Sequence, residues 1–346
     1  MAVAEPISPP RSGRLRRSDP GGPGYARRRC GKGFIYADEH GERIADAEIV
    51  ARITALVIPP AWRDAWISPD PLGHIQATGY DDAGRRQYLY HPRWRARRDL
   101  QKFDDMVRFA RALPALREVV EHDLARGDLS REQVLACAAR LLDRGLFRIG
   151  SEQYAVTNET YGLATMRKEH VTVDGETLVF DYVAKERKRR VHAVVDPDIA
   201  ALVATLKRRR RGGIELLAYK RDGRWCDVRS PDINAYLKAA TGLDVSAKDF
   251  RTWGATVLAE VALAVTEPAK LTRTARKRAI VRAVKEVAYY LGNTPAVARA
   301  SYIDPRVFDR YRDGQTIDGA LHLVGAEPGA TAIQGPVEEA VLDLLD

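Results

Sequence analysis

The sequence predicts an α+β protein in which a small antiparallel β-sheet comes first and a mainly α-helical domain follows. Two observations indicate this order. Short strand-like runs bounded by turn residues occupy the segment from about residue 34 to residue 91. Beyond about residue 102, apolar residues recur at helical spacing, and a single alternating hairpin pattern at 177–195 interrupts them. A chain of 346 residues exceeds the usual size of one domain, so we expect two.

The N-terminal sheet domain is expected to span residues 25–91. A helix from about 46 to 56 keeps its apolar residues on one face before a Pro-Pro pair stops it. The last two strands, at 73–80 and 85–91, are separated by a polar turn and therefore predict a hairpin.

The segments on either side of this sheet differ from it in composition. Residues 1–24 are rich in Pro, Gly, Ser and Arg and carry little apolar surface, so we expect a basic, disordered arm. Residues 92–101 are charged and turn-prone, which predicts an interdomain linker that acts as a hinge. The C-terminal domain should then cover residues 102–346.

The C-terminal domain is predicted to be helical around one β-hairpin. A core helix at 131–147 has Ser130 as its N-cap and Gln133 three positions later. The hairpin strands at 177–184 and 191–195 flank a charged turn that begins at Lys185. Further helices are expected at 196–209, 231–240, 247–264 and 276–291.

Charge and cysteine usage restrict the class of protein. The chain has 56 Lys and Arg against 47 Asp and Glu, and this net charge of +9 favours a polyanionic partner. On composition alone, ordinary surface charge explains the excess equally well. Cys30, Cys137 and Cys226 follow no metal-ligand or disulfide spacing, so we expect no metal and a reducing compartment. We find no signal peptide or membrane span, which predicts a cytoplasmic protein without a membrane partner.

Polyanion chemistry without a metal ion makes specific demands on side chains. Negative charge accumulates on the oxygens of a phosphodiester under attack, and arginine can meet it because the planar guanidinium contacts two oxygens at once. A departing sugar oxygen needs a proton, which a lysine beside arginines can donate because its pKa is lowered. A tyrosine phenol can both attack phosphorus and leave again.

Five motifs that supply these groups resemble those of the type IB DNA topoisomerases, in particular the poxvirus-like and bacterial branch. They are Leu146-Phe-Arg148-Ile-Gly-Ser-Glu-Gln-Tyr154, the turn lysine Lys185, Lys248-Asp-Phe-Arg251-Thr-Trp-Gly, Leu291-Gly-Asn293 and Ser301-Tyr302-Ile-Asp-Pro-Arg306. The resemblance covers roughly residues 26–315. It implies a C-terminal catalytic domain with the fold that these enzymes share with the tyrosine recombinases.

The resemblance also implies catalytic roles. Tyr302 resembles the nucleophile that forms a 3′-phosphotyrosyl bond, and Arg148 and Arg251 resemble the two arginines that clamp the scissile phosphate. Lys185 resembles the general acid that protonates the leaving 5′-oxygen. Asn293 stands where poxviral members have histidine, and it can donate a hydrogen bond but cannot transfer a proton. Taken singly, each of these residues has an ordinary structural explanation, and their joint occurrence is what favours the catalytic one.

Candidate DNA contacts follow from the same resemblance. Gln87, Tyr88 and Tyr90 resemble a poxviral segment that contacts the major groove. Period-2 alternation places both tyrosines on one face of a strand. The alternative to DNA contact is that the two tyrosines cover the domain's own sheet. Contacts with the backbone near the cut are expected from Lys248, Tyr154 and Lys168. The basic run 187–190 should add phosphate contacts collectively.

The implied activity is relaxation of supercoiled duplex DNA by a monomer that needs no metal, cofactor or nucleotide. One alternative is a tyrosine recombinase, which shares the catalytic domain. Recombinases usually carry His-x-x-Arg where this chain has Lys248-Asp-Phe-Arg251, and a helical N-terminal domain where this chain predicts a sheet. A second alternative is a non-catalytic basic DNA-binding protein, which has no need of Tyr302.

Overall fold

The computed structural model describes residues 13–266, 271–325, 331 and 333–346. The chain divides into two compact units, Met1–Lys102 and Phe103–Asp346, and each is described by itself. An antiparallel sheet occupies the first unit and helices dominate the second, which confirms the predicted α+β class.

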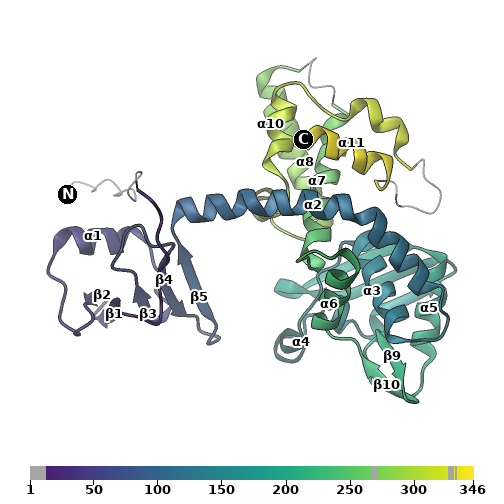
Figure 1. Cartoon of the computed structure of the whole chain (residues 1–346), viewed down its shortest axis with the longest axis horizontal. Helices are drawn as coiled ribbons and strands as arrows, with labels where there is room; N and C mark the ends of the chain where they lie inside the picture. The colour runs from purple at the N-terminus through teal and green to yellow at the C-terminus, as the bar shows by residue number, and fades with distance from the viewer. Residues whose placement is uncertain (1–12, 267–270, 326–330, 332) are drawn as a thin grey trace. The chain divides into compact units, whose positions relative to one another are not determined.

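The described part of the first unit contains a five-stranded antiparallel sheet and helix α1 (Figure 1). Its strands lie in the order β2-β1-β3-β4-β5. Helix α1 begins after the N-cap Asp46, whose carboxylate accepts hydrogen bonds from the first turn, and it buries Ile53 against Ile58, Ile67 and Ala77. The bounds are β1 Tyr25–Cys30, β2 Gly33–Ala37, α1 Ala47–Ala55, β3 Arg63–Ile67, β4 Ile75–Tyr80 and β5 Arg86–Tyr90.

The prediction of a disordered arm at 1–24 is wrong for residues 13–24. The backbone N–H of Ser18 donates a hydrogen bond to His74 Nδ1 at 2.9 Å, and its hydroxyl donates to the carbonyl of Ile75. Trp66 Nε1 donates to the carbonyl of Gly22 at 3.1 Å. The small residues that suggested disorder instead let the backbone pack closely against the sheet, since a Cβ at Gly24 would meet the indole of Trp66. Residues 1–12 of the predicted arm lie outside the described residues.

The predicted turn-prone linker at 92–101 is also wrong in conformation, because this segment is the first part of helix α2 (Pro92–Leu124). Pro92 occupies the first helical position, where its missing N–H costs nothing. The residues that follow, mostly Arg, Ala, Leu, Gln and Lys, are good helix formers. The charge that suggested an extended linker is compatible with the exposed face of a helix.

The second unit is built around helices α3 and α7, most of whose residues are buried. The predicted core helix is confirmed, with Ser130 accepting a hydrogen bond from the N–H of Gln133. Besides the part of α2 from Phe103 onward, the described helices of this unit are α3 Arg131–Gly145, α4 Glu152–Asn158, α5 Pro197–Arg208, α6 Ser230–Thr241, α7 Ala247–Ala264, α8 Arg273–Leu291, α9 Pro295–Ser301, α10 Pro305–Arg312 and α11 Pro336–Leu345. Short 3₁₀ turns occur at Leu163–Thr165, Lys168–His170 and Asp318–Leu323.

The predicted hairpin is confirmed as part of a three-stranded sheet in the order β6-β7-β8. Its strands are β6 Val171–Asp174, β7 Thr177–Ala184 and β8 Lys188–Val195. The last pair of the hairpin is Ala184 with Lys188, so Lys185 begins a three-residue turn. A separate ribbon of β9 Ala218–Arg221 and β10 Arg224–Asp227 was not predicted.

The C-terminal helix α11 packs on the core of its own unit. Val337, Val341 and Leu345 are buried, and Arg117 links Glu338 of this helix to Asp143. The two carboxylates outweigh the burial of Arg117 and raise its pKa. Helix α11 therefore forms part of the core of this unit. Among the described residues, the helices are all too short or too polar to span a membrane.

A buried glutamate in α7 gives a prediction about stability. Glu260 is fully buried, and burial raises its pKa to about 7 although the N–H of Ile317 donates to it. Because the pKa of Glu260 is higher in the folded than in the unfolded protein, its carboxyl contributes to the free energy of unfolding below about pH 4.5. That contribution is lost as the pH rises through about 7. We therefore expect Glu260→Gln to stabilise the protein by up to roughly 3 kcal/mol at pH 8 and by little at pH 4.5. Urea unfolding at both pH values measures this, and an equal difference at the two would contradict it.

Candidate active site

The C-terminal end of helix α8 brings together three of the predicted catalytic side chains. The carbonyl of Leu291 accepts hydrogen bonds from Arg148 Nη1 at 3.4 Å and from Arg251 Nη2 at 3.0 Å. The carbonyl of Gly292 accepts from Arg148 Nη2 at 3.1 Å, and the same nitrogen contacts Oδ1 of Asn293. Carbonyls at a helix end carry partial negative charge, so this end attracts both guanidinium groups. Two arginines that would otherwise repel are held side by side.

Arg148 is positioned by the loop that follows α3. Leu146 ends that helix in the left-handed conformation, at φ 48°, and turns the chain toward α8. The carbonyl of Arg148 accepts a hydrogen bond from Leu163 N at 2.8 Å. Gly150 lies against Gly162 so closely that neither position has room for a Cβ. These contacts fix the backbone on both sides of the arginine.

Arg251 reaches the same place from the interior of helix α7. It is only 4% exposed, and its Nη1 donates to the carbonyl of Leu146 at 2.5 Å. Burial and the neighbouring charge of Arg148 lower the pKa of Arg251 to about 10, which still leaves it protonated at neutral pH. Its Nε is buried without a partner among the described residues. Unpaired buried donors are costly, so an incoming oxygen that paired with it would be favoured.

Tyr302 lies beside this pair of arginines. It caps the short helix α9, and its N–H donates to the carbonyl of Ala298 at 3.0 Å. The guanidinium carbon of Arg251 is 5.2 Å from the centre of its ring. Burial raises the pKa of the Tyr302 phenol, but the positive charges of Arg251, Arg148 and Lys248 outweigh burial, and the net pKa lies below its ordinary value. A more acidic phenol is easier to deprotonate for attack and is a better leaving group.

Asn293 comes after the C-cap Gly292 of α8, and its N–H donates to the carbonyl of Ala288. Its side-chain oxygen is occupied by Arg148, while its Nδ2 is buried without a partner among the described residues. This arrangement leaves an N–H donor available beside the two arginines.

A prediction follows for this position. The topoisomerase resemblance implies only a donated hydrogen bond from residue 293 during DNA cleavage, so Asn293→Ala should slow cleavage by about 10²-fold, whereas Asn293→His should stay within about 10-fold of wild type. Single-turnover cleavage of a duplex oligonucleotide measures both rates. Equal rates for wild type and Asn293→Ala would show that the side chain has no role in catalysis.

Lys185 lies outside this cluster. It is exposed in the turn of the β7–β8 hairpin, whose next two residues, Glu186 and Arg187, both have positive φ. The pKa of Glu186 is lowered first by its hydrogen bond to Lys188, with smaller effects from Lys185 and Arg148. The turn is therefore within electrostatic range of Arg148. The structure does not bring the lysine into contact with Arg148, Arg251, Asn293 or Tyr302.

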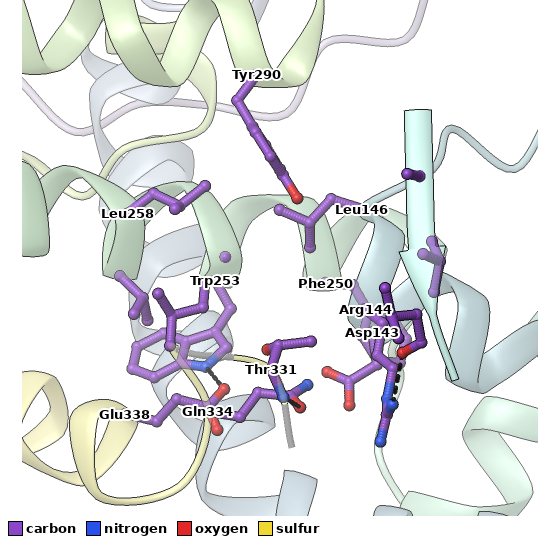
Figure 2. A pocket seen from close by; sticks show the side chains of 16 residues that line it. Asp143, Arg144, Leu146, Phe250, Trp253, Leu258, Tyr290, Thr331, Gln334 and Glu338 are labelled. Atoms are coloured by element: carbon purple, nitrogen blue, oxygen red, sulfur yellow. Dashed lines mark hydrogen bonds between the residues drawn. The ribbon is translucent and has the colours of Figure 1, made fainter. Parts of the chain in front are cut away.

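A cavity of about 370 Å³ lies between α7, strand β8 and the C-terminal segment (Figure 2). Leu146, whose carbonyl holds Arg251, contributes its side chain to this cavity, and Tyr290 borders it. Trp253 Nε1 donates to Glu338 at 2.7 Å in its wall. The five predicted catalytic residues are not among the residues that line it.

In the described part of the chain, His, Cys, Asp and Glu side chains form no group of three or more that could hold a metal ion.

Comparison with known proteins places the chain in a family. Residues 91–316 match the family described as the catalytic core of eukaryotic DNA topoisomerase I, and residues 33–81 match the N-terminal domain of bacterial DNA topoisomerase IB. The first match covers more than half of the chain. The chain belongs to the type IB DNA topoisomerases.

Individual relatives agree with this assignment. DNA topoisomerase 1B of Acanthamoeba polyphaga mimivirus is 27% identical over 317 residues, which cover 87% of this chain and 94% of the relative. DNA topoisomerase 1B of vaccinia virus is 21% identical over 288 residues, covering 80% and 83%. These viral relatives and the bacterial N-terminal domain support the poxvirus-like and bacterial branch of the type IB topoisomerases.

The three residues that the resemblance singled out for contacts with the DNA backbone differ in their surroundings. Lys248 is exposed in the first turn of α7, close enough to Tyr302 to influence its pKa. Tyr154 is 44% exposed on α4, a helix without buried residues. Lys168 Nζ donates to the carbonyl of Arg209 at 3.1 Å, and burial lowers its pKa. The structure leaves Lys248 and Tyr154 exposed and engages Lys168 in a contact with the protein.

In the sheet unit, Tyr88 and Tyr90 lie on one face of β5 as predicted, with their rings stacked 6.0 Å apart. They are 39% and 41% exposed. Gln87 does not share this face, because the side chains of a strand alternate, and its amide donates to Asp81 at 2.9 Å. Among the three residues expected at the major groove, the two tyrosines thus form an exposed aromatic pair and the glutamine supports a turn.

The sequence interpretation missed the particular place of Arg190. It was grouped with the basic run 187–190 as a phosphate contact, but its guanidinium donates to the carbonyls of Tyr289 and Tyr290, at 3.1 and 2.5 Å. The two-residue side-chain period of the strand could have distinguished Arg190 from the other basic residues of this run. Alternation along β8 puts Arg190, His192 and Val194 on the inner face and Arg189 on the outer face.

Proposed function

We propose that this chain relaxes supercoiled duplex DNA by cutting one strand with Tyr302 and resealing it. The phenol attacks the scissile phosphorus and forms a 3′-phosphotyrosyl bond, and the 5′-oxygen leaves with a proton. Rotation of the free 5′ end releases supercoils of either sign, and the reverse reaction rejoins the strand. The observation that carries this proposal is the position of Tyr302 beside two arginines held together at the end of α8.

The roles of the arginines and of Asn293 follow from their donors. Arg148 and Arg251 would clamp the phosphoryl oxygens, and the unpaired Nε of Arg251 and Nδ2 of Asn293 would gain acceptors from them. Fixed charges in a partly buried site stabilise the transition state more strongly than charges in water. In this proposal a phosphate that enters the site replaces backbone carbonyls as the acceptor of the arginine N–H groups.

Lys185 would supply the proton to the leaving 5′-oxygen, assisted by Arg148. Its exposed place on a hairpin turn allows it to approach bound DNA with a local movement. The exposed Tyr88, Tyr90, Lys248 and Tyr154 would contact the DNA around the cut, as would Lys168 and Gln87 after exchanging their present protein partners.

This cycle requires no energy source. One phosphodiester is exchanged for another of similar energy, so no nucleotide hydrolysis is needed, and arginine and lysine groups take the place of a metal ion. We further propose that the enzyme acts as a monomer. The match of residues 33–81 to a bacterial domain supports a bacterial protein that works on the nucleoid in the cytoplasm.

Relaxation assays with plasmid DNA test the proposal. The full chain should relax positively and negatively supercoiled plasmid in EDTA without nucleotide, and sedimentation should give the mass of one chain. A strict requirement for Mg²⁺ or ATP would contradict the metal-free transesterification. Strand exchange between paired sites, without relaxation of single plasmids, would favour the recombinase alternative.

A further inference from the structure

Three arginines, rather than two, converge on the end of helix α8. Arg148 and Arg251 bind the carbonyls of Leu291 and Gly292, as described above. Arg190 approaches from strand β8 and donates to the carbonyls of Tyr289 and Tyr290, the two residues immediately before them. The last carbonyls of the helix, from residue 289 to residue 292, are therefore occupied by guanidinium groups from three different elements.

The contact between β8 and α8 is close on both sides of Arg190. The ring of His192, next on the inner face of β8, meets the ring of Tyr290 edge to face at 5.7 Å. Gly292 has φ +62°, and a Cβ at this position would lie 2.8 Å from the guanidinium of Arg190. The guanidinium thus lies directly against the backbone that leads into Asn293. Arg190 and His192 form a specific junction between the hairpin and the helix end.

This junction connects the two parts of the proposed site. Lys185 lies in the turn of the hairpin, five residues before Arg190, and the helix end holds Arg148, Arg251 and Asn293. Along β8, the register from Arg190 opposite Tyr182 to Lys188 opposite Ala184 is unbroken, so fixing Arg190 limits where the turn can lie. A second tie is the hydrogen bond from Tyr161 N to the carbonyl of Val183.

We propose that Arg190 is a positioning residue that anchors the Lys185 hairpin to the end of α8 and so sets the distance between the general acid and the scissile phosphate. This inference rests on the function proposed above. Arginine suits the position because its planar fork reaches two successive carbonyls, whereas a lysine ammonium would keep the charge but not the geometry. Loss of the anchor should harm the step that depends on Lys185 more than attack by Tyr302.

The nature of the leaving group separates these two steps. Oxygen needs a proton to leave, whereas a 5′-bridging sulfur at the scissile phosphate leaves as a thiolate without one. A duplex oligonucleotide carrying a cleavage site mapped with the wild-type enzyme can be made with either atom at that position. Single-turnover cleavage of both forms then reports the contribution of proton donation for each variant.

With the oxygen substrate, Arg190→Ala should cleave about 10- to 100-fold more slowly than wild type, because displacement of a reacting group by about 1 Å costs up to about 10²-fold. With the sulfur substrate, its rate should return to within about 3-fold of wild type, as should that of Lys185→Ala. Arg251→Ala should be slow on both substrates. Arg190→Lys should lie between Arg190→Ala and wild type.

The matched control is Arg189→Ala. Arg189 is on the same strand but faces outward and pairs with Asp181 at 2.5 Å, so its loss should leave the ratio of sulfur to oxygen rates unchanged. Thermal melting of each variant checks the fold, and if Arg190→Ala is unfolded, Arg190→Lys carries the test with the same expected direction.

Two results would overturn the role of Arg190. One is a defect of equal size on both substrates, which would place it in binding or in the general fold. The other is a wild-type rate with oxygen. Neither result bears on the proposed function, which fails separately if wild-type protein forms no covalent adduct with either substrate.

Discussion

Replacing Tyr302 with phenylalanine is expected to abolish relaxation, lowering the rate by at least about 10⁴-fold. The substitution removes one hydroxyl oxygen, and with it the atom that would bond to phosphorus. The ring remains beside Arg251, so folding and DNA affinity should change little. Plasmid relaxation under enzyme excess measures the loss, and a gel-shift assay measures the affinity.

The matched control is Tyr290→Phe. This tyrosine is near the same helix end, but its hydroxyl is directed toward the neighbouring cavity, and its backbone carbonyl, which Arg190 binds, is unaltered (Figure 2). Tyr290→Phe should relax plasmid within about 3-fold of wild type. Undiminished relaxation by Tyr302→Phe would rule out Tyr302 as the nucleophile and reopen the assignment of the site.

Replacing Arg251 with alanine is expected to have the second-largest effect, slowing single-turnover cleavage by about 10³-fold or more. The charge that faces the phosphoryl oxygens is lost. Arg251 also lowers the pKa of Tyr302, so the phenol should become less acidic and the rise of cleavage rate with pH should shift to higher pH. Arg251→Lys should recover only part of the rate, since an ammonium cannot hold the carbonyls of Leu146 and Leu291 together.

The same substitution should also destabilise the protein, because the carbonyl of Leu146 loses its arginine donor and the carbonyl of Leu291 keeps only Arg148. We expect a loss of about 2 kcal/mol or more in urea unfolding. Arg117→Ala provides the control. Arg117 pairs with Asp143 and Glu338 and contacts none of the proposed catalytic residues, so its loss should lower stability without a specific loss of cleavage. Equal cleavage rates for Arg251→Ala and Arg117→Ala, measured where both are folded, would contradict a catalytic role for Arg251.

Local sequence patterns predicted the elements that carry the site. The apolar stripe and the N-cap Ser130 predicted α3, and strict alternation predicted the β7–β8 hairpin with Lys185 at its turn. These succeed because periodicity and capping are decided by residues a few positions apart. The order of residues 13–24 and the helical start of α2 were not predicted. Composition shows which segments are polar enough to face solvent, but it does not show which backbone groups of the folded sheet such a segment can bind.

The arrangement within the site was less accessible to sequence. Motif order singled out Arg148, Arg251, Asn293 and Tyr302, but not that the carbonyl end of α8 gathers the arginines. Those contacts join residues 143 and 40 positions apart, and no local pattern encodes them. Arg190 belongs to the same class of contact, because its place becomes visible only when the strand period is combined with the packing of β8 on α8.

Trapping the reaction intermediate tests the central claim most directly. The full chain is mixed with supercoiled plasmid and denatured during the reaction, and the DNA-bound peptide is isolated and identified by mass spectrometry. The account predicts a peptide containing Tyr302, joined through its phenolic oxygen to a 3′-phosphate and absent from the Tyr302→Phe protein. A linkage to another residue, a 5′-phosphate linkage, or relaxation without any covalent adduct would contradict it.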